Sequence, residues 1–190
     1  MKSWQIALIV VAAVVVLGLL WVVGSYNGLV KSEVTVDEKW ANVQTAYQRR
    51  ADLIPNLVAT VKQYAAHEQE VFTAVTEARA RVMSAQTPSE LGSASYQMSS
   101  ALSRLIAVAE NYPQLKANEN FLSLQDELAG TENRVKTERD IYNAAVKDFN
   151  VRIRSFPTNI LAGMFGFGQK QMFEAAVGSE NAPKVGELFN

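Results

Sequence analysis

RRADLIPNLVATVKQYAAHEQE, residues 49–70, places a proline inside a pattern that otherwise predicts one unbroken helix. Pro55 has no amide hydrogen, and its ring clashes with the carbonyl group of Ala51. We therefore expect a kink at this position and a carbonyl oxygen of Ala51 that needs a donor from elsewhere.

Apolar residues recur at three- and four-residue spacing over positions 36–82, and only Arg50 and Glu68 interrupt them. This spacing indicates a long amphipathic helix that turns one face towards a partner. Arg50 has two open interpretations. It lies at the edge of that face, or it fixes the register of the helices or binds a partner. Glu138, on a later helix, is expected at the edge of its face, because an unpaired buried carboxylate is costly.

Residues 6–23 contain no charged side chain, and Trp4 and Trp21 stand near the two ends of this run. At about 1.5 Å per residue the run spans roughly 27 Å, close to the thickness of a bilayer core. The alternative is a cleaved signal peptide, whose apolar region is usually shorter. We expect residues 1–24 to form a retained single-pass anchor. Lys2 favours a cytoplasmic N-terminus in a bacterial inner membrane, with the C-terminal domain outside the cytoplasm.

Three further helices are expected, at about 59–86, 88–110 and 118–155. The second has the clearest start, because Thr87 and Glu90 form a capping box around Pro88. Short connections favour antiparallel neighbours. The predicted fold is all-α: a transmembrane anchor, a helical stalk over 25–58, an antiparallel long-helix bundle over 59–155, and an apolar glycine-rich segment with a frayed tail over 156–190.

If the first helix continues to residue 86, the second returns only to the level of about residue 63, and the stalk keeps an uncovered apolar face. Self-association into a homo-oligomer is the expected way to cover it; the C-terminal segment or another envelope protein are the alternatives. The aromatic residues of the C-terminal segment either cap the bundle core or contact a partner or the membrane. The candidate interaction residues are Trp40, Val43, Tyr47, Arg50, Ile54, Pro55, Leu57, Phe165 and Phe167.

Several blocks resemble the bacterial LemA family. They include RRADLIPNLV (49–58), NYPQLKANENFLSLQDELAGTENR (111–134) and SFPTNILAGMFGF (155–167), in the order that the family shows. The resemblance implies a membrane-anchored helical-bundle protein of poorly defined function, with relatives implicated in magnetosome formation. It implies no catalytic residues and no cofactor.

The composition agrees with a protein that is not an enzyme. A net charge of -1 argues against nucleic-acid binding, and the absence of cysteine excludes thiolate metal sites. The one histidine, His67, lacks the second histidine that a zinc-binding or di-iron helix motif needs. We expect no catalytic, metal-binding or cofactor-binding residue. The expected function is an envelope scaffold or adaptor. A ligand-binding or stress-sensing module is the alternative, and an unrecognised enzyme the third possibility.

The first testable prediction concerns the anchor. The intact mass of the purified protein should include residues 1–24, because the apolar run is longer than that of a typical signal peptide. In spheroplasts, protease added from outside should digest the bundle. A mass lacking these residues would contradict retention, and digestion only after the membrane is opened would contradict the orientation.

Overall fold

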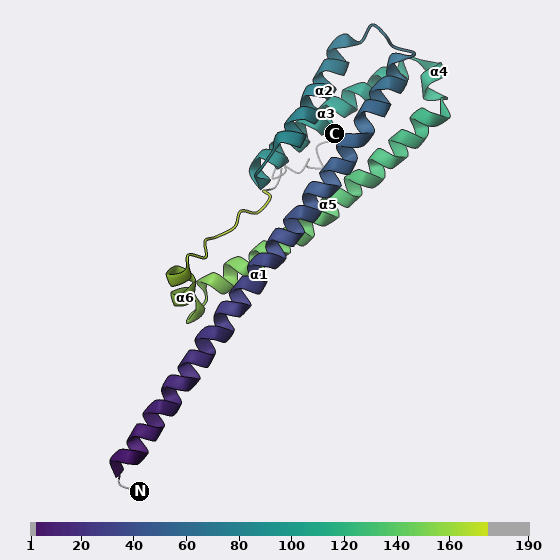
Figure 1. Ribbon diagram of the computed structural model, residues 1–190. Coiled ribbons are helices and arrows are strands. Elements are labelled where there is room, and N and C mark those ends of the chain that lie inside the picture. The colour runs from purple at the N-terminus through teal and green to yellow at the C-terminus, as the bar shows by residue number, and fades with distance from the viewer. Residues whose placement is uncertain (1–2, 175–190) are drawn as a thin grey trace, which may run out of the picture. The chain divides into compact units, whose positions relative to one another are not determined.

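The computed structural model describes residues 3–174, and every regular element within them is a helix. The elements are α1 (Ser3–Lys62), α2 (Gln69–Ser84), α3 (Pro88–Glu110), α4 (Pro113–Lys116), α5 (Glu119–Arg154) and α6 (Thr158–Phe165) (Figure 1). The all-α fold with one long apolar N-terminal helix is therefore confirmed. The frayed tail expected near the C-terminus lies, from residue 175 on, outside the described residues.

The chain forms two compact units. Within the described residues the first unit contains 3–42 and 140–170, and the second contains 43–139 and 171–174. The expected boundary between stalk and bundle near residue 58 does not coincide with this division. Both α1 and α5 contribute residues to each unit, so each unit is described separately below.

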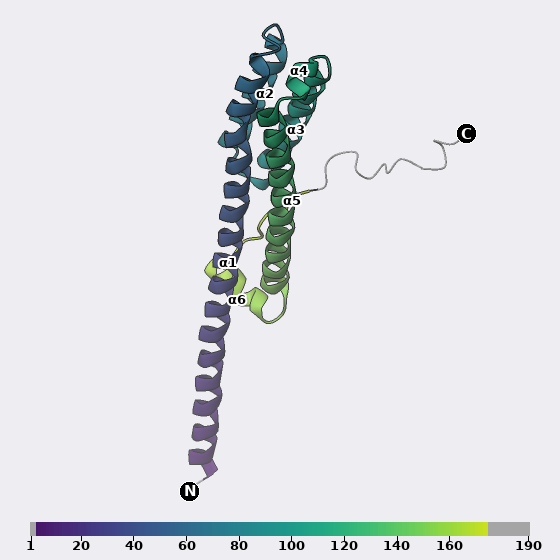
Figure 2. The same ribbon diagram turned by 90° about the vertical axis from the view of Figure 1, so that its right-hand side faces the viewer.

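In the first unit the N-terminal part of α1 lies beside the C-terminal part of α5, and the two run antiparallel (Figure 2). Arg152 of α5 reaches Gly28, while Tyr142, earlier in α5, contacts Trp40 of α1. The apolar run of α1 is long enough to cross a membrane, and none of its most apolar window is buried in the protein. This exposure distinguishes the run from the core helix of a globular domain.

The second unit contains four longer helical segments and the one-turn helix α4. The C-terminal part of α1, then α2, α3 and the N-terminal part of α5 follow one another with alternating direction (Figure 1). The helix expected over 59–86 is therefore wrong as one element, because α1 ends at Lys62 and α2 begins at Gln69. The helices expected over 88–110 and 118–155 are confirmed as α3 and α5.

Residues 63–68 reverse the chain without any glycine or proline. Partners far along the sequence hold this connection in place. Asn118 donates from its side-chain nitrogen to the Tyr64 hydroxyl at 3.0 Å, and the Tyr112 hydroxyl donates to a carboxylate oxygen of Glu68 at 3.4 Å. The connection between α1 and α2 is thus tied to the connection between α3 and α5.

The reversal changes the direction of every later helix. The last long helix, α5, starts beside the 63–68 connection and runs antiparallel to α1 in the second unit. Arg50 of α1 and Glu132 of α5 form an ion pair further along the same helix pair. The apolar face of α1 is accordingly covered within the chain: Val43, Ile54 and Leu57 are buried.

Pro55 lies inside α1, and the helix continues through it to Lys62. The hydrogen-bond donor that the Ala51 carbonyl group was expected to need comes from α2. The Arg79 side chain donates through Nε to the Ala51 oxygen at 2.8 Å. The same guanidinium group lies 3.7 Å from the carboxylate of Asp52. The proline therefore does not end the helix, and the bond that it prevents is replaced by a bond between α1 and α2.

The capping box at the start of α3 is present as predicted. The Glu90 amide donates to the Thr87 hydroxyl at 3.2 Å, and the Thr87 amide donates to the Glu90 carboxylate at 3.3 Å. Together with Pro88 in the first turn, these bonds satisfy amides that a helix start leaves free.

The second testable prediction is a double-mutant cycle between Pro55 and Arg79. Arg79→Met should lower the free energy of unfolding by about 1 kcal/mol, because it leaves the Ala51 carbonyl group without a donor. Pro55→Ala supplies an amide for that oxygen, so Arg79→Met should cost less in its presence. Both costs of Arg79→Met are measured by chemical denaturation of the full chain in mild detergent, with circular dichroism as the signal. Arg81→Met is the matched control; an equal cost of Arg79→Met in both backgrounds would contradict the coupling.

Candidate functional site

Five of the seven predicted interaction residues on α1 lie in the core of the second unit. In the second unit Val43, Tyr47, Arg50, Ile54 and Leu57 are all buried. They are therefore not available to a partner without unfolding. Association of two copies stays a prediction, but the uncovered stripe that motivated it is absent.

The two other predicted residues of α1 differ from this group. Trp40, in the first unit, is half-buried, and its ring centroid lies 5.4 Å from that of Tyr142. Burial, and to a lesser degree the negative charge of Asp37, raise the pKa of the Tyr142 hydroxyl. Pro55 is exposed.

Arg50 is a buried cation that connects three helices of the second unit. The residue is only 5% exposed, pairs with Glu132 of α5 and donates to the Ser99 hydroxyl of α3 at 3.3 Å. Its Nε and Nη1 atoms have no hydrogen-bond partner among the described residues. Because a buried charge needs its partner, Arg50 fixes the positions of α1, α3 and α5 relative to one another within the unit.

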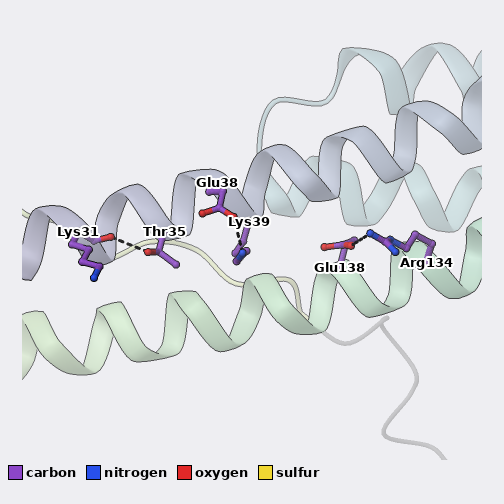
Figure 3. Close-up of polar contacts among 6 residues, drawn as sticks. All are labelled: Lys31, Thr35, Glu38, Lys39, Arg134 and Glu138. Atoms are coloured by element: carbon purple, nitrogen blue, oxygen red, sulfur yellow. Dashed lines mark hydrogen bonds and ion pairs between the residues drawn. The ribbon is translucent and has the colours of Figure 1, made fainter.

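Glu138 was expected at an edge, and this expectation is wrong. The residue is buried, and its carboxylate accepts an ion-pair contact from Arg134 at 2.8 Å, one turn earlier on α5 (Figure 3). The exposed Arg134 side chain supplies the compensating charge from the surface of the unit. In the first unit, the exposed partners Lys39 and Glu38 form a simple surface pair (Figure 3).

Two hollows lie at the end of the α2–α3 hairpin in the second unit. The larger, of about 640 Å³, is named here the hairpin groove. Because the capping amides of Gln86 and Thr87 lower the pKa of Glu90, this carboxylate is charged at neutral pH. The groove is lined by the small residues Ser84, Ala85, Ser89, Ser93 and Ala94 and by the polar residues Arg81, Gln86, Glu90 and Gln97.

The smaller hollow, of about 100 Å³, lies between α1 and this hairpin. Tyr47, Gln44 and Gln48 of α1 line it together with Met83 and Leu91. The Tyr47 hydroxyl is buried and has no hydrogen-bond partner among the described residues. Small-molecule sites typically have volumes of about 300 Å³ or more, so this hollow is too small for one. Its volume suits a few water molecules.

In the first unit Lys170 fastens the C-terminal segment to α1 and α5. Its ammonium group lies 2.8 Å from the Glu33 carboxylate and 3.8 Å from that of Asp37. Its backbone amide donates to the side-chain oxygen of Asn150, whose side-chain nitrogen donates back to the Lys170 carbonyl group, both at 2.9 Å. These four residues are named the Lys170 clasp.

The clasp is stable to changes of pH around neutrality. The hydrogen bond to Glu33, helped by the charge of Asp37, raises the pKa of Lys170. A raised lysine pKa contributes stability below the unfolded value, about 10.4, and loses it only as the pH rises through the folded value. Lys170 is therefore fully charged at neutral pH.

Phe165 and Phe167, the last two predicted residues, lie beside α1 in the first unit. Their ring centroids are 4.8 Å and 5.9 Å from that of Tyr26, both in edge-to-face geometry. Phe165 stays half exposed despite this contact. Of the aromatic residues expected to cap the core, Phe173 is buried in the second unit, with its ring 4.6 Å from the Arg139 guanidinium group.

No group of three or more potential metal ligands occurs among residues 3–174. His67 is exposed in the connection between α1 and α2. The described residues thus offer hollows and surfaces for binding.

The LemA family model matches residues 39–186, which is more than half of the chain. The chain belongs to the LemA family. The match includes the C-terminal part of α1 and all later helices, so the resemblance seen in the sequence is confirmed. The apolar run of α1 lies before the matched range.

The chain is also similar to individual proteins. It is 27% identical over 190 residues to magnetosome protein MamQ 2 of Paramagnetospirillum magneticum, covering 86% of this chain and 70% of that protein. It is 26% identical to magnetosome protein MamQ of Magnetospirillum gryphiswaldense, covering 78% of this chain and 64% of that protein. It is 25% identical to protein LemA of Metamycoplasma hominis, covering 81% and 71%. The names of these relatives describe no enzyme.

Sequence reasoning did not find the hairpin groove, the Lys170 clasp or the Arg79 contact. The groove had one signal, because serines at 89, 93 and 100 recur on one face of α3 around Tyr96. The clasp had none, since Lys170 meets Glu33 and Asn150 only after the chain has reversed.

The third testable prediction concerns the Arg50–Glu132 pair. Glu132→Gln should destabilise the bundle more than Arg50→Met, because the first leaves a buried cation unpaired while the second leaves a carboxylate that is 52% exposed to water. We expect about 1–2 kcal/mol for Glu132→Gln, measured by chemical denaturation in mild detergent. The exposed Glu127→Gln is the control. The reverse order of the two costs would contradict this account of Arg50.

Proposed function

We propose that this protein is a non-catalytic scaffold or adaptor of the bacterial envelope, anchored in the inner membrane with its bundle outside the cytoplasm. One helix, α1, contains both the exposed apolar run and the buried core residues Val43 and Leu57. The same element can therefore attach the chain to lipid and organise the bundle. Magnetosome protein names among the relatives support a role at a membrane.

The observation that carries the adaptor role is the hairpin groove with its neighbouring surface. Small side chains such as Ser89 and Ser93 allow the backbone of a partner to approach α3 closely. Tyr96, three residues after Ser93, is 69% exposed, and Met83 of α2 is exposed beside the smaller hollow. Tyrosine and methionine are enriched at protein interfaces. The Arg81 and Glu90 charges would orient a polar peptide or helix in the groove.

A ligand-sensing role is the second candidate, supported by the unpartnered Tyr47 hydroxyl beside the smaller hollow. A hollow of about 100 Å³ admits only a very small polar molecule. The hairpin groove is larger and is lined by α2 and α3, which a protein partner could reach. The adaptor role therefore explains the larger of the two hollows. Tyr47→Phe should leave adaptor binding unchanged if this ranking is correct.

The fourth testable prediction uses a photo-crosslinking amino acid at Tyr96 in living cells. We expect a crosslink to a distinct envelope protein, because Tyr96 is exposed on α3 three residues after Ser93 of the groove. Ser93→Trp should abolish the crosslink by filling the groove, without changing the unfolding temperature of the purified protein. Ser123→Trp, the same change at an exposed position of α5, is the matched control.

Three outcomes would contradict the adaptor role at this groove. These are no crosslink, a crosslink that survives Ser93→Trp, or one that joins only two copies of this chain. The last outcome would instead support the homo-oligomer. Loss of the crosslink with Ser123→Trp as well would show that the effect is not specific to the groove.

A further inference from the structure

Residues 155–167, SFPTNILAGMFGF, form an uncharged apolar segment around α6 in the first unit. Phe156 is 81% exposed and Met164 is 73% exposed, and Ile160 and Phe165 are also exposed. Leu161 and Ala162 are buried, so α6 has an inner and an outer side.

The exposed apolar residues lie close together along the segment. Ile160 and Met164 are one turn apart on α6, Phe165 follows Met164 directly, and Phe156 precedes the helix. These four side chains are named the α6 outer face. A group of exposed apolar side chains of this kind is rarely left in water and marks a contact with a partner or a membrane.

The position of α6 next to α1 indicates that the contact is with the membrane. Phe165 contacts Tyr26, which stands three residues beyond the apolar run of α1, residues 6–23. At about 1.5 Å per residue, Tyr26 lies roughly 4.5 Å beyond the end of that run. The headgroup layer of a bilayer is about 5–8 Å thick on each side. Phe165 is therefore at the level of the lipid headgroups when α1 spans the membrane.

Basic residues lie next along α1 and α5. Arg152 donates to the Gly28 carbonyl group at 3.0 Å and to the Ser32 hydroxyl at 2.9 Å, and Arg154 is exposed in the last turn of α5. Gly28 lies roughly 7.5 Å beyond the end of the apolar run. Aromatic rings at the headgroup level with arginines just outside them are typical of a helix that lies in the membrane interface.

The segment is also held at both of its ends. Arg152 fixes the end of α5 to α1 before the segment begins, and the Lys170 clasp fixes the chain to Glu33 and Asn150 after it. Gly166, at φ 78°, ends α6 in the left-handed region and lets the Phe167 amide donate back to the Ala162 carbonyl group. The α6 outer face therefore cannot leave the neighbourhood of Tyr26 without breaking these contacts.

We propose that the α6 outer face inserts into the headgroup and upper acyl layer of the same bilayer that α1 spans, as a second, interfacial attachment. This inference rests on the anchoring part of the proposed function. Lipid is favoured over a second copy of the chain, because spanning of the bilayer by the neighbouring apolar run of α1 places lipid headgroups at this level and the segment has no charge to desolvate.

The test uses the absence of native cysteine. The full chain with Met164→Cys, labelled with an environment-sensitive fluorophore, is placed in nanodiscs of phosphatidylethanolamine and phosphatidylglycerol. Nitroxide lipids quench the label from the headgroup, the upper acyl chain or the bilayer centre. Ile141→Cys, exposed on α5 in the same unit, is the control outside the membrane, and Val15→Cys reports on the anchor.

We expect blue-shifted emission at position 164 and loss of most of its fluorescence with headgroup and upper-chain quenchers, little quenching at 141, and strong quenching at 15 from the bilayer centre. Quenching at 15 without quenching at 164 would overturn the α6 inference and leave the anchor intact. A blue shift at 164 without quenching would assign the face to a second copy and also overturn it. Absence of quenching at 15 would overturn the anchor and the inference together.

Discussion

The hydrogen bond from Arg79 to the carbonyl oxygen of Ala51 is the contact on which the second unit depends. Pro55 removes the amide that would normally satisfy this oxygen, and a buried or half-buried carbonyl group without a donor is costly. The replacement donor comes from α2, so α2 has to lie alongside α1 at this level. A local defect in one helix thereby becomes a specific contact between two helices.

The chain reversal at residues 63–68 decides what the apolar face of α1 does. With the reversal, α5 runs antiparallel to α1, and residues such as Ile54 are buried by the chain itself. Without it, the same face would need a second chain. One six-residue connection therefore separates a self-contained bundle from an obligate oligomer, and periodicity alone cannot distinguish them because the three- and four-residue spacing continues through the connection.

The features that could be predicted from the sequence are those with local causes. The capping box at Thr87 and the need for a donor at Ala51 follow from neighbouring residues, and both are present. The reversal could not be predicted, because the 63–68 connection has no glycine or proline and depends on Asn118 and Tyr112, about fifty residues away. Of the predicted interaction residues, Phe165 is exposed, because the Tyr26 ring covers only part of it. The stripe on α1 belongs to the core.

The first unit shows why a second attachment to the membrane would matter. A single spanning helix fixes the height of a domain but leaves rotation about the helix axis and a range of tilts open. The α6 outer face lies to one side of α1, held there by Arg152 and the Lys170 clasp. If this face lies in lipid, tilting α1 away from α6 would expose Phe156 and Met164 to water, and tilting it towards α6 would push Arg152 towards the acyl chains. The two attachments together therefore restrict the tilt of the first unit as well as its height.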